Sequence, residues 1–207
     1  MQDDETGSWW QQITGEAIFG SSKGQRLKQV MHDELSFSLW KQEHPDGRVL
    51  LPDDSKPWKK FSEDWEEHTA KLPVLPELNP DTRLSARTQI VGIRIAANAK
   101  AYLLSALQRE TPILDSIGDT PVIIVMAEDK KSVRAFERRI DGRELEIFAK
   151  TDSHAVRLVD TQTGSEWDFT GRGVSGPYAG RELKRIYALN DYWFDWKAYN
   201  PDTEVYR

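Results

Sequence analysis

The chain has 207 residues, of which 38% are hydrophobic and 30% are charged, and its formal net charge is −6. This length fits one large domain or two small ones with a core of ordinary size. The acidic balance argues against a nucleic-acid partner, because phosphate binding needs a basic surface. No apolar run is long enough to insert into a membrane. Cysteine is absent, which excludes disulfides, a thiolate nucleophile and cysteine-ligated metal, and leaves the redox compartment undecided.

The first segment of the chain, residues 3–50, recurs as residues 160–206, so the sequence contains an internal repeat. The aligned pairs include Gly7 and Gly164, Trp10 and Trp167, Gly15 and Gly171, Gly20 and Gly176, Gly24 and Gly180, Trp40 and Trp196, Pro45 and Pro201, Asp46 and Asp202, and Val49 and Val205. A bulky apolar group that occurs in both copies is most simply explained by core packing, so we expect the four aligned tryptophans to be buried.

In the first copy, the pattern predicts a hairpin, a loop and a short helix at about Leu35–Glu43, capped by Asp33 and ended by Pro45. Residues 51–88 then form a proline-rich connector, with one short acidic helix predicted at Ser62–Lys71.

Residues 89–159 are rich in strand signals. Strands are predicted at Ile90–Ile95, Ile113–Ile117 and Pro121–Met126, and Ala99–Leu107 suits either a strand or a short helix. The clearest hairpin joins Val133–Ile140 to Glu144–Ala149 around Asp141-Gly142, the sequence that a tight two-residue turn prefers.

The second copy predicts strands at Ala155–Val159, Glu166–Thr170 and Glu182–Tyr187, and a helix at Tyr192–Tyr199 capped by Asn190-Asp191. Its glycine-rich loop, Gly171–Gly180, superficially suggests a phosphate cradle. Because a strand follows the loop where such a cradle needs a helix, turns with positive φ are the preferred interpretation.

These elements predict a mainly β (α+β) fold, with a curved antiparallel sheet or barrel-like β core and short helices. Residues 89–207 would be a complete second module, and residues 1–50 the C-terminal part of a first module, joined by the connector 51–88. An incomplete module leaves a strand edge and apolar surface uncovered. We therefore expect the parts to pack as one globular unit; the alternatives are a homodimer or an upstream polypeptide that completes the first module.

Catalytic signatures are missing from the sequence. The histidines His32, His44, His68 and His154 lack metal-ligand spacing, and no GxSxG elbow occurs, so we expect no metal and no cofactor. Asp46 and Asp202 share a turn position after proline, which favours a structural role over acid–base chemistry. Three tryptophans have no aligned tryptophan, namely Trp9, Trp58 and Trp65. Clamping of the connector is the preferred role for them, and stacking on a ligand or a partner is the alternative.

Several segments resemble the prokaryotic family named domain of unknown function 3179, which is built from tandem copies of this module. They include Asp4–Trp10, Gly15–Ile18, His44–Leu50, Ala101–Leu107, Gly176–Gly180 and Asn200–Tyr206. The resemblance implies no established activity, and it suggests an extracytoplasmic setting because members often carry an export signal. It also implies a Cys-Pro-Leu-Cys-like segment in the first module, whereas the matching stretch of the second module, Val125–Val133, lacks cysteine.

Two functions remain open on these grounds. The first is a non-catalytic binding or interaction module of an exported protein, with its pocket between the two modules, because every catalytic signature is missing. The alternative is a fragment of an enzyme or of a metal or redox protein whose active cysteines lie upstream. Enzymatic activity is therefore undecided, and the sequence leans against it.

Overall fold

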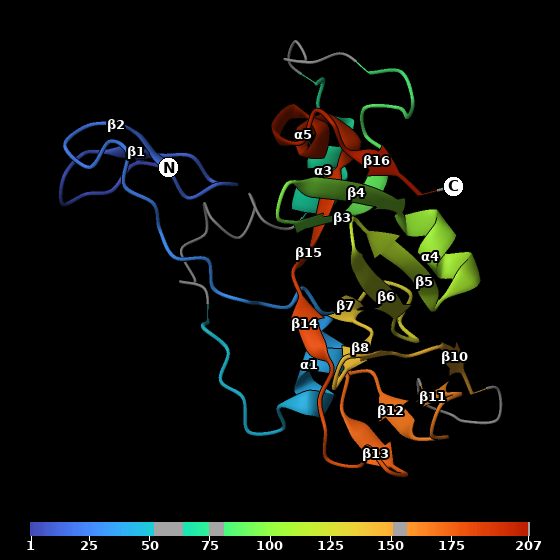
Figure 1. The fold of residues 1–207 in the computed structure, drawn as a ribbon. Coiled ribbons are helices and arrows are strands. Elements are labelled where there is room, and N and C mark those ends of the chain that lie inside the picture. Colours follow the sequence, from blue (N-terminus) through green and yellow to red (C-terminus); the bar gives the residue numbers. More distant parts are fainter. Residues whose placement is uncertain (52–63, 75–80, 151–156, 207) are drawn as a thin grey trace. The chain divides into compact units, whose positions relative to one another are not determined.

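The computed structural model describes residues 1–51, 64–74, 81–150 and 157–206 (Figure 1). By compactness the chain divides into two units, Met1–Asp33 and Glu34–Arg207. The boundary that we predicted at residue 50 marks the end of the first repeat copy. The boundary at Asp33 separates segments that contact each other little. The predicted helix of the first copy therefore belongs to the second unit. Much of the predicted connector, including Trp58, lies outside the described residues.

The first unit is a small hairpin in which β1 (Trp9–Trp10) pairs antiparallel with β2 (Ala17–Phe19). The carboxylate of Asp3 holds the turn before β1, because it accepts hydrogen bonds from the indole of Trp10 at 2.7 Å and from the hydroxyl of Thr6 at 2.8 Å. These bonds, the one from Trp10 above all, lower the pKa of Asp3 to about 2.

The second unit repeats this arrangement in its own chain segment. Asp160 accepts hydrogen bonds from the indole of Trp167 at 3.0 Å and from the hydroxyl of Thr163 at 2.9 Å. Each of the two aligned segments also contains an isolated bridge between an acidic and a basic residue. Glu16 faces Arg26 in the first unit, and Arg172 faces Glu182 in the second, so the order of the charges is reversed.

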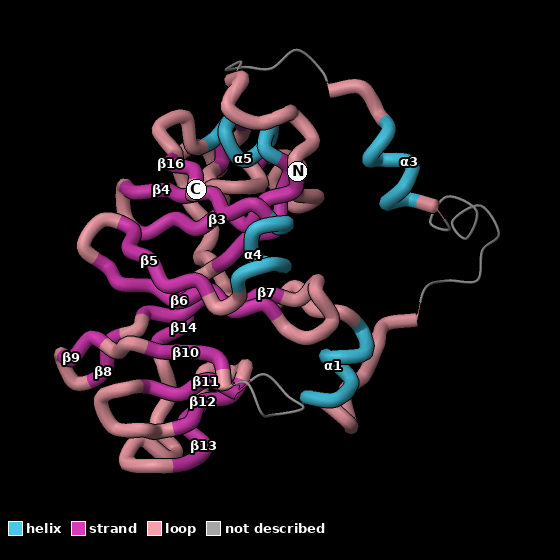
Figure 2. The backbone as a smooth tube through the Cα atoms, turned by 90° about the vertical axis from the view of Figure 1, so that its right-hand side faces the viewer, coloured by secondary structure: helices cyan, strands magenta, loops and turns pink. Residues whose placement is uncertain are grey.

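The second unit contains three four-stranded sheets and four short helices among the described residues (Figure 2). The first sheet has the order β15 (Ala188–Tyr192), β3 (Gln89–Ile95), β4 (Asn98–Leu103), β16 (Glu204–Val205); the second has the order β14 (Lys184–Ile186), β7 (Val133–Glu137), β6 (Thr120–Met126), β5 (Ile113–Ile117); the third has the order β10 (Ile147–Ala149), β11 (Arg157–Asp160), β12 (Glu166–Asp168), β13 (Gly173–Ser175). The helices are α1 (Phe37–Glu43), α3 (Trp65–Lys71), α4 (Leu104–Glu110) and α5 (Trp193–Tyr199).

Strand β6 explains how the sheets share a core, because both of its faces are buried. Ile124 and Val122 pack with Val91 and Ile93 of the first sheet, whereas Ile123 belongs to the cluster around Trp167 of the third. An unbroken apolar run is what a strand buried on both faces requires. The mainly β fold with antiparallel sheets is confirmed, no closed barrel forms among the described strands, and β16 pairs parallel to β4.

The structure confirms several predicted elements. Ile113–Ile117 pairs with β6, and Ala99–Leu107 combines both alternatives, because β4 ends at Leu103 and α4 follows directly. Asp141 and Gly142 both have positive φ, as a tight turn requires, and so do the glycines at positions 171, 176 and 180.

Other predicted boundaries were wrong. The long hairpin around Asp141-Gly142 shrinks to β8 (Arg139–Ile140) and β9 (Arg143–Glu144), because β7 pairs with β6 and β14, while β10 pairs with β11. Helix α1 is capped by Ser36 in place of Asp33. The predicted cap Asn190-Asp191 lies inside β15, because backbone pairing with β3 takes precedence over a local side-chain cap.

Asp191 gives a pH-dependent prediction. Burial, with the charge of Asp195 adding to it, raises the pKa of Asp191 from 3.8 to about 7. The folded state therefore retains this proton up to a higher pH than the unfolded state, and stability falls as pH rises from about 4 to 7. We expect Asp191→Asn to stabilise the chain by about 2 kcal/mol at pH 8, roughly half the full linkage value because the carboxyl is only partly buried, and to change little at pH 4.

Urea unfolding at both pH values measures this difference. Asp202→Asn is the matched control, because it removes the same charge from an exposed turn. An equal effect of the two variants at pH 8 would contradict the assignment.

Candidate functional site

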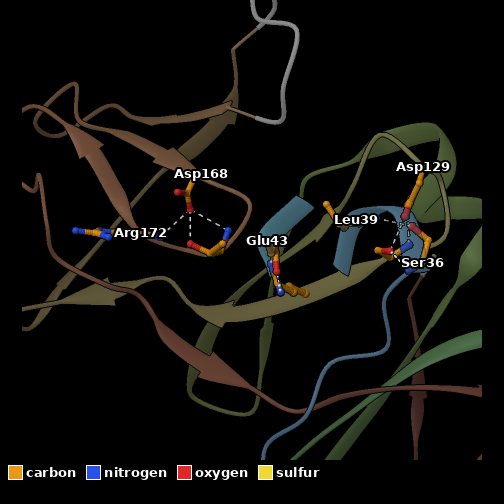
Figure 3. A network of polar contacts seen from close by, with 9 residues as sticks. Ser36, Leu39, Glu43, Asp129, Asp168 and Arg172 are labelled. Carbon is orange, nitrogen blue, oxygen red and sulfur yellow. Dashed lines mark hydrogen bonds and ion pairs between the residues drawn. The ribbon is translucent and has the colours of Figure 1, made fainter. Parts of the chain in front are cut away.

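A pocket of about 480 Å³ lies within the second unit, where α1 meets the loop after β6, strand β11 and the turn after β12. Its lining includes Ser36, Leu39, Glu43, Asp129, Arg157 and Asp168. Figure 3 shows that the carboxylate groups come from three different parts of the chain.

One wall of the pocket is fixed by an ion pair. Arg134 in β7, whose side chain is 3% exposed, donates to both carboxylate oxygens of Glu43 in α1, at 2.6 and 2.7 Å. The guanidinium also lies 4.7 Å from the ring centre of Phe169, a cation–π contact. The pair therefore anchors α1 to the second sheet, which contains β7, and it neutralises the charge of Glu43.

A second carboxylate, Asp129, is held by its own loop. It accepts hydrogen bonds from the backbone and the hydroxyl of Ser132, at 2.8 and 2.5 Å, and the backbone amide of Ser36 donates to the same hydroxyl at 2.9 Å. Burial raises the pKa of Asp129, but the bonds from Ser132 and Ser36 outweigh it and lower the pKa to about 2. Asp129 is consequently ionised at neutral pH, and Ser36 ties it to the start of α1.

The third carboxylate, Asp168, closes the turn between β12 and β13. It accepts hydrogen bonds at Oδ1 from the backbone and the hydroxyl of Thr170, at 2.9 and 2.6 Å, and from the backbone of Arg172 at 3.2 Å. Within the described chain, the hydrogen bonds that its carboxylate accepts all go to Oδ1, which leaves Oδ2 for a ligand.

The charges of the lining do not balance. Four carboxylates, those of Glu43, Glu128, Asp129 and Asp168, face the single guanidinium of Arg157. Since Arg134 balances Glu43 from the wall, three carboxylates remain against one cation, an excess of two negative charges. The lining offers acceptor oxygens, hydroxyls and an apolar floor of Leu39 and Phe169. No group of three or more metal-ligating side chains occurs among the described residues.

The residues that the sequence singled out lie elsewhere. Trp9 and Trp65 are about half exposed, at 54% and 49%, and neither lines the pocket. Asp46 and Asp202 are exposed in turns. Trp58 and His154 lie outside the described residues, and the other histidines are exposed.

The aligned tryptophans differ in burial. Trp167 and Trp196 are buried, at 0% and 4% exposure, as expected, whereas Trp10 and Trp40 are only half-buried. Burial was expected at all four positions; it is nearly complete at Trp167 and Trp196 and partial at the other two. Trp196 packs against Gly92 of β3, whereas Gly47 in the loop after α1 lies against the indole of Trp40.

Sequence reasoning missed the pocket residues themselves. The Asp168-x-Thr170-Gly171 sequence does carry a local signal, because an aspartate followed by a hydroxyl residue and a glycine is typical of a turn closed by the carboxylate. The Glu43–Arg134 pair has no such signal, since its members are 91 positions apart.

The fold and the pocket define a mainly β protein with a pocket whose lining is acidic. Residues 1–203 match the sequence profile described as Protein of unknown function (DUF3179), and the chain belongs to this family. No curated protein and no solved structure matches the chain. None of the described helices is long and apolar enough to span a membrane.

Proposed function

We propose that the chain is a non-catalytic binding module that holds a small cationic ligand in the pocket beside α1. The observation that carries the proposal is the excess of two negative charges on the lining, where Asp129 and Asp168 are already held by hydrogen bonds. Asp129 and Asp168 accept hydrogen bonds from residues of their own loops, so these side chains are already ordered before a ligand binds.

The lining also indicates what else the ligand carries. Arg157 forms no ion pair with a described residue, and it provides the one cationic donor of the pocket. Arg157 is the cross-strand partner of Asp168, so a ligand whose ammonium group lies close to a hydroxyl or carboxylate group meets both side chains. An amino sugar or a basic amino acid has this chemistry, and its carbon frame would lie over Phe169.

Asp168→Asn is expected to weaken binding of such a ligand at least tenfold, because it removes a negative charge from the pocket lining. The asparagine still has a side-chain oxygen that accepts the hydrogen bond from Thr170. Isothermal titration with glucosamine, lysine and spermidine, and with neutral glucose as a comparison, measures the effect. The matched control is Asp202→Asn, which makes the same change of net charge away from the pocket.

Binding of glucose as tight as that of glucosamine, or an equal loss in both variants, would contradict a cation site. Turnover of a bound compound would contradict the non-catalytic part of the proposal.

The alternative function is that of an enzyme or a metal or redox protein whose cysteines lie in an upstream part of the family's module. One observation favours it: Ala127, Glu128 and Asp129 line the pocket, and they belong to the stretch Val125–Val133 that matches the cysteine-bearing segment of the family. Expression together with the sequence that precedes Met1 in its gene tests this alternative, since added zinc binding or disulfide exchange would favour it over simple binding.

We also infer an extracytoplasmic setting, which rests on the family resemblance alone. Fractionation of the native cells with an antibody to the chain tests it, and recovery only in the cytoplasm would overturn it.

A further inference from the structure

Helix α5 shows how one helix of the repeat is seated. Trp196 lies against Gly92 of β3, in a cluster with Ile90 and Ala101. The chain on either side of the helix joins the same hairpin: β15 pairs antiparallel with β3, and β16 pairs parallel with β4. The hairpin β3–β4 therefore covers the apolar face of α5 and both of its flanking strands.

Helix α1 has the corresponding residues without that cover. Phe37 and Trp40 align with Trp193 and Trp196, and their rings stack 5.8 Å apart. Phe37 is nevertheless 65% exposed, and no residue of α1 is buried. Glu43, beside Trp40, pairs with Arg134 of β7, and Leu39 packs against the cluster around Trp167, so the helix is anchored while Phe37 stays exposed.

The segment after α1 is open in the same way. Val49 aligns with Val205 of β16, and Leu50 aligns with Tyr206, whose ring contacts Tyr102 of β4 at 5.3 Å. Residues 48–51 pair with no described strand, and Leu50 is 95% exposed. A shallow hollow of about 500 Å³ lies beside Trp40 and Gly47.

We propose that the face of α1 formed by Phe37 and Trp40, together with residues 48–51, binds an antiparallel β-hairpin of the β3–β4 kind that another polypeptide supplies. The proposal rests on the internal repeat and is independent of the ligand pocket. The hairpin brings a glycine under the indole of Trp40, as Gly92 lies under Trp196. One of its strands pairs parallel with residues 48–49, as β4 does with β16.

The occupant is another polypeptide and not a second copy of this chain. Both edges of the β3–β4 hairpin are already paired, with β15 on one side and β16 on the other. A second copy could offer the hairpin only by giving up its own first sheet, including the burial of Trp196.

The probe is a synthetic peptide with the sequence of Thr88–Leu104, which contains β3, β4 and their turn. We expect the full chain to bind it at one site, and Trp40→Ala and Leu50→Lys to weaken binding at least tenfold. Leu50→Lys cannot unfold the chain, because that side chain is almost fully exposed. Trp65→Ala is the matched control, since it removes a half-exposed indole from α3. Isothermal titration provides the affinities.

A peptide that carries valine at the Gly92 position should lose binding, because the added atoms would overlap the indole of Trp40. Absence of binding by the unmodified peptide overturns the proposal, and so does equal binding by the Trp40→Ala and Trp65→Ala chains. A chain dimer in sedimentation that Leu50→Lys dissociates would assign the face to a second copy and overturn it as well.

Discussion

Gly92→Ala is expected to destabilise the second unit by about 3 kcal/mol, the upper end of the usual cost of overpacking. An added Cβ at this position would overlap the ring of Trp196. The strand cannot move to make room, because β3 lies between β15 and β4, where Gly92 is opposite Leu189 on one side and Ala101 on the other. The buried indole has no exit towards solvent either, since it is 4% exposed.

Urea unfolding followed by circular dichroism measures this loss. Gly47→Ala is the control, because its Cβ would also come within 2.6 Å of an indole, that of Trp40. Trp40 is half-buried and can turn towards solvent, so the contact that remains is with the backbone oxygen of His44 at 2.9 Å, and we expect a cost of about 1 to 2 kcal/mol, less than at Gly92. Equal losses at the two glycines would mean that α5 is no better covered than α1.

Glu43→Ala has the second largest expected effect, a loss of about 2 to 3 kcal/mol. The variant removes the carboxylate that pairs with the buried guanidinium of Arg134. Leaving a buried charge without its carboxylate typically costs about 3 to 5 kcal/mol, and the figure is reduced here because Glu43 is partly exposed. Arg134→Met should cost less, because it removes the buried charge and retains apolar volume beside Phe169.

A double-mutant cycle with both substitutions separates the pair from its surroundings. The control is the bidentate pair of Arg181 and Asp141, which has similar geometry but is about half exposed. Asp141→Asn should therefore change stability far less than Glu43→Ala does. If Glu43→Ala costs no more than this control, the ion pair does not anchor α1.

The sequence predicts those elements whose cause is local. The run Pro121–Met126 is apolar at nearly every position, and it is the strand that is buried on both faces. The turn at Asp141-Gly142 has positive φ at both residues, and few residue pairs other than Asp-Gly and Asn-Gly adopt that conformation readily. The length of the hairpin around this turn could not be predicted, because β6 and β11 compete for the same strands.

The candidate site could not be predicted for the same physical reason. Its residues come from positions 36–43, 127–129, 157 and 168–170, which only the sheet topology brings together. Aligned residues also suggested equal environments for Trp40 and Trp196. Burial of a side chain depends on what covers it, and the cover of Trp196 comes from β3, a strand outside the aligned segments.

The exchange of charges between the two hairpins has a consequence for how the chain folds. Similar segments in one polypeptide can exchange partners during folding, and such misassembly is a characteristic failure of proteins with repeats. In the native pairings Glu16 faces Arg26, and Arg172 faces Glu182. A bridge between the two segments would instead bring Glu16 opposite Glu182, or Arg172 opposite Arg26. Like charges directly opposite each other repel, so the charges of these bridges favour the native partner within each segment.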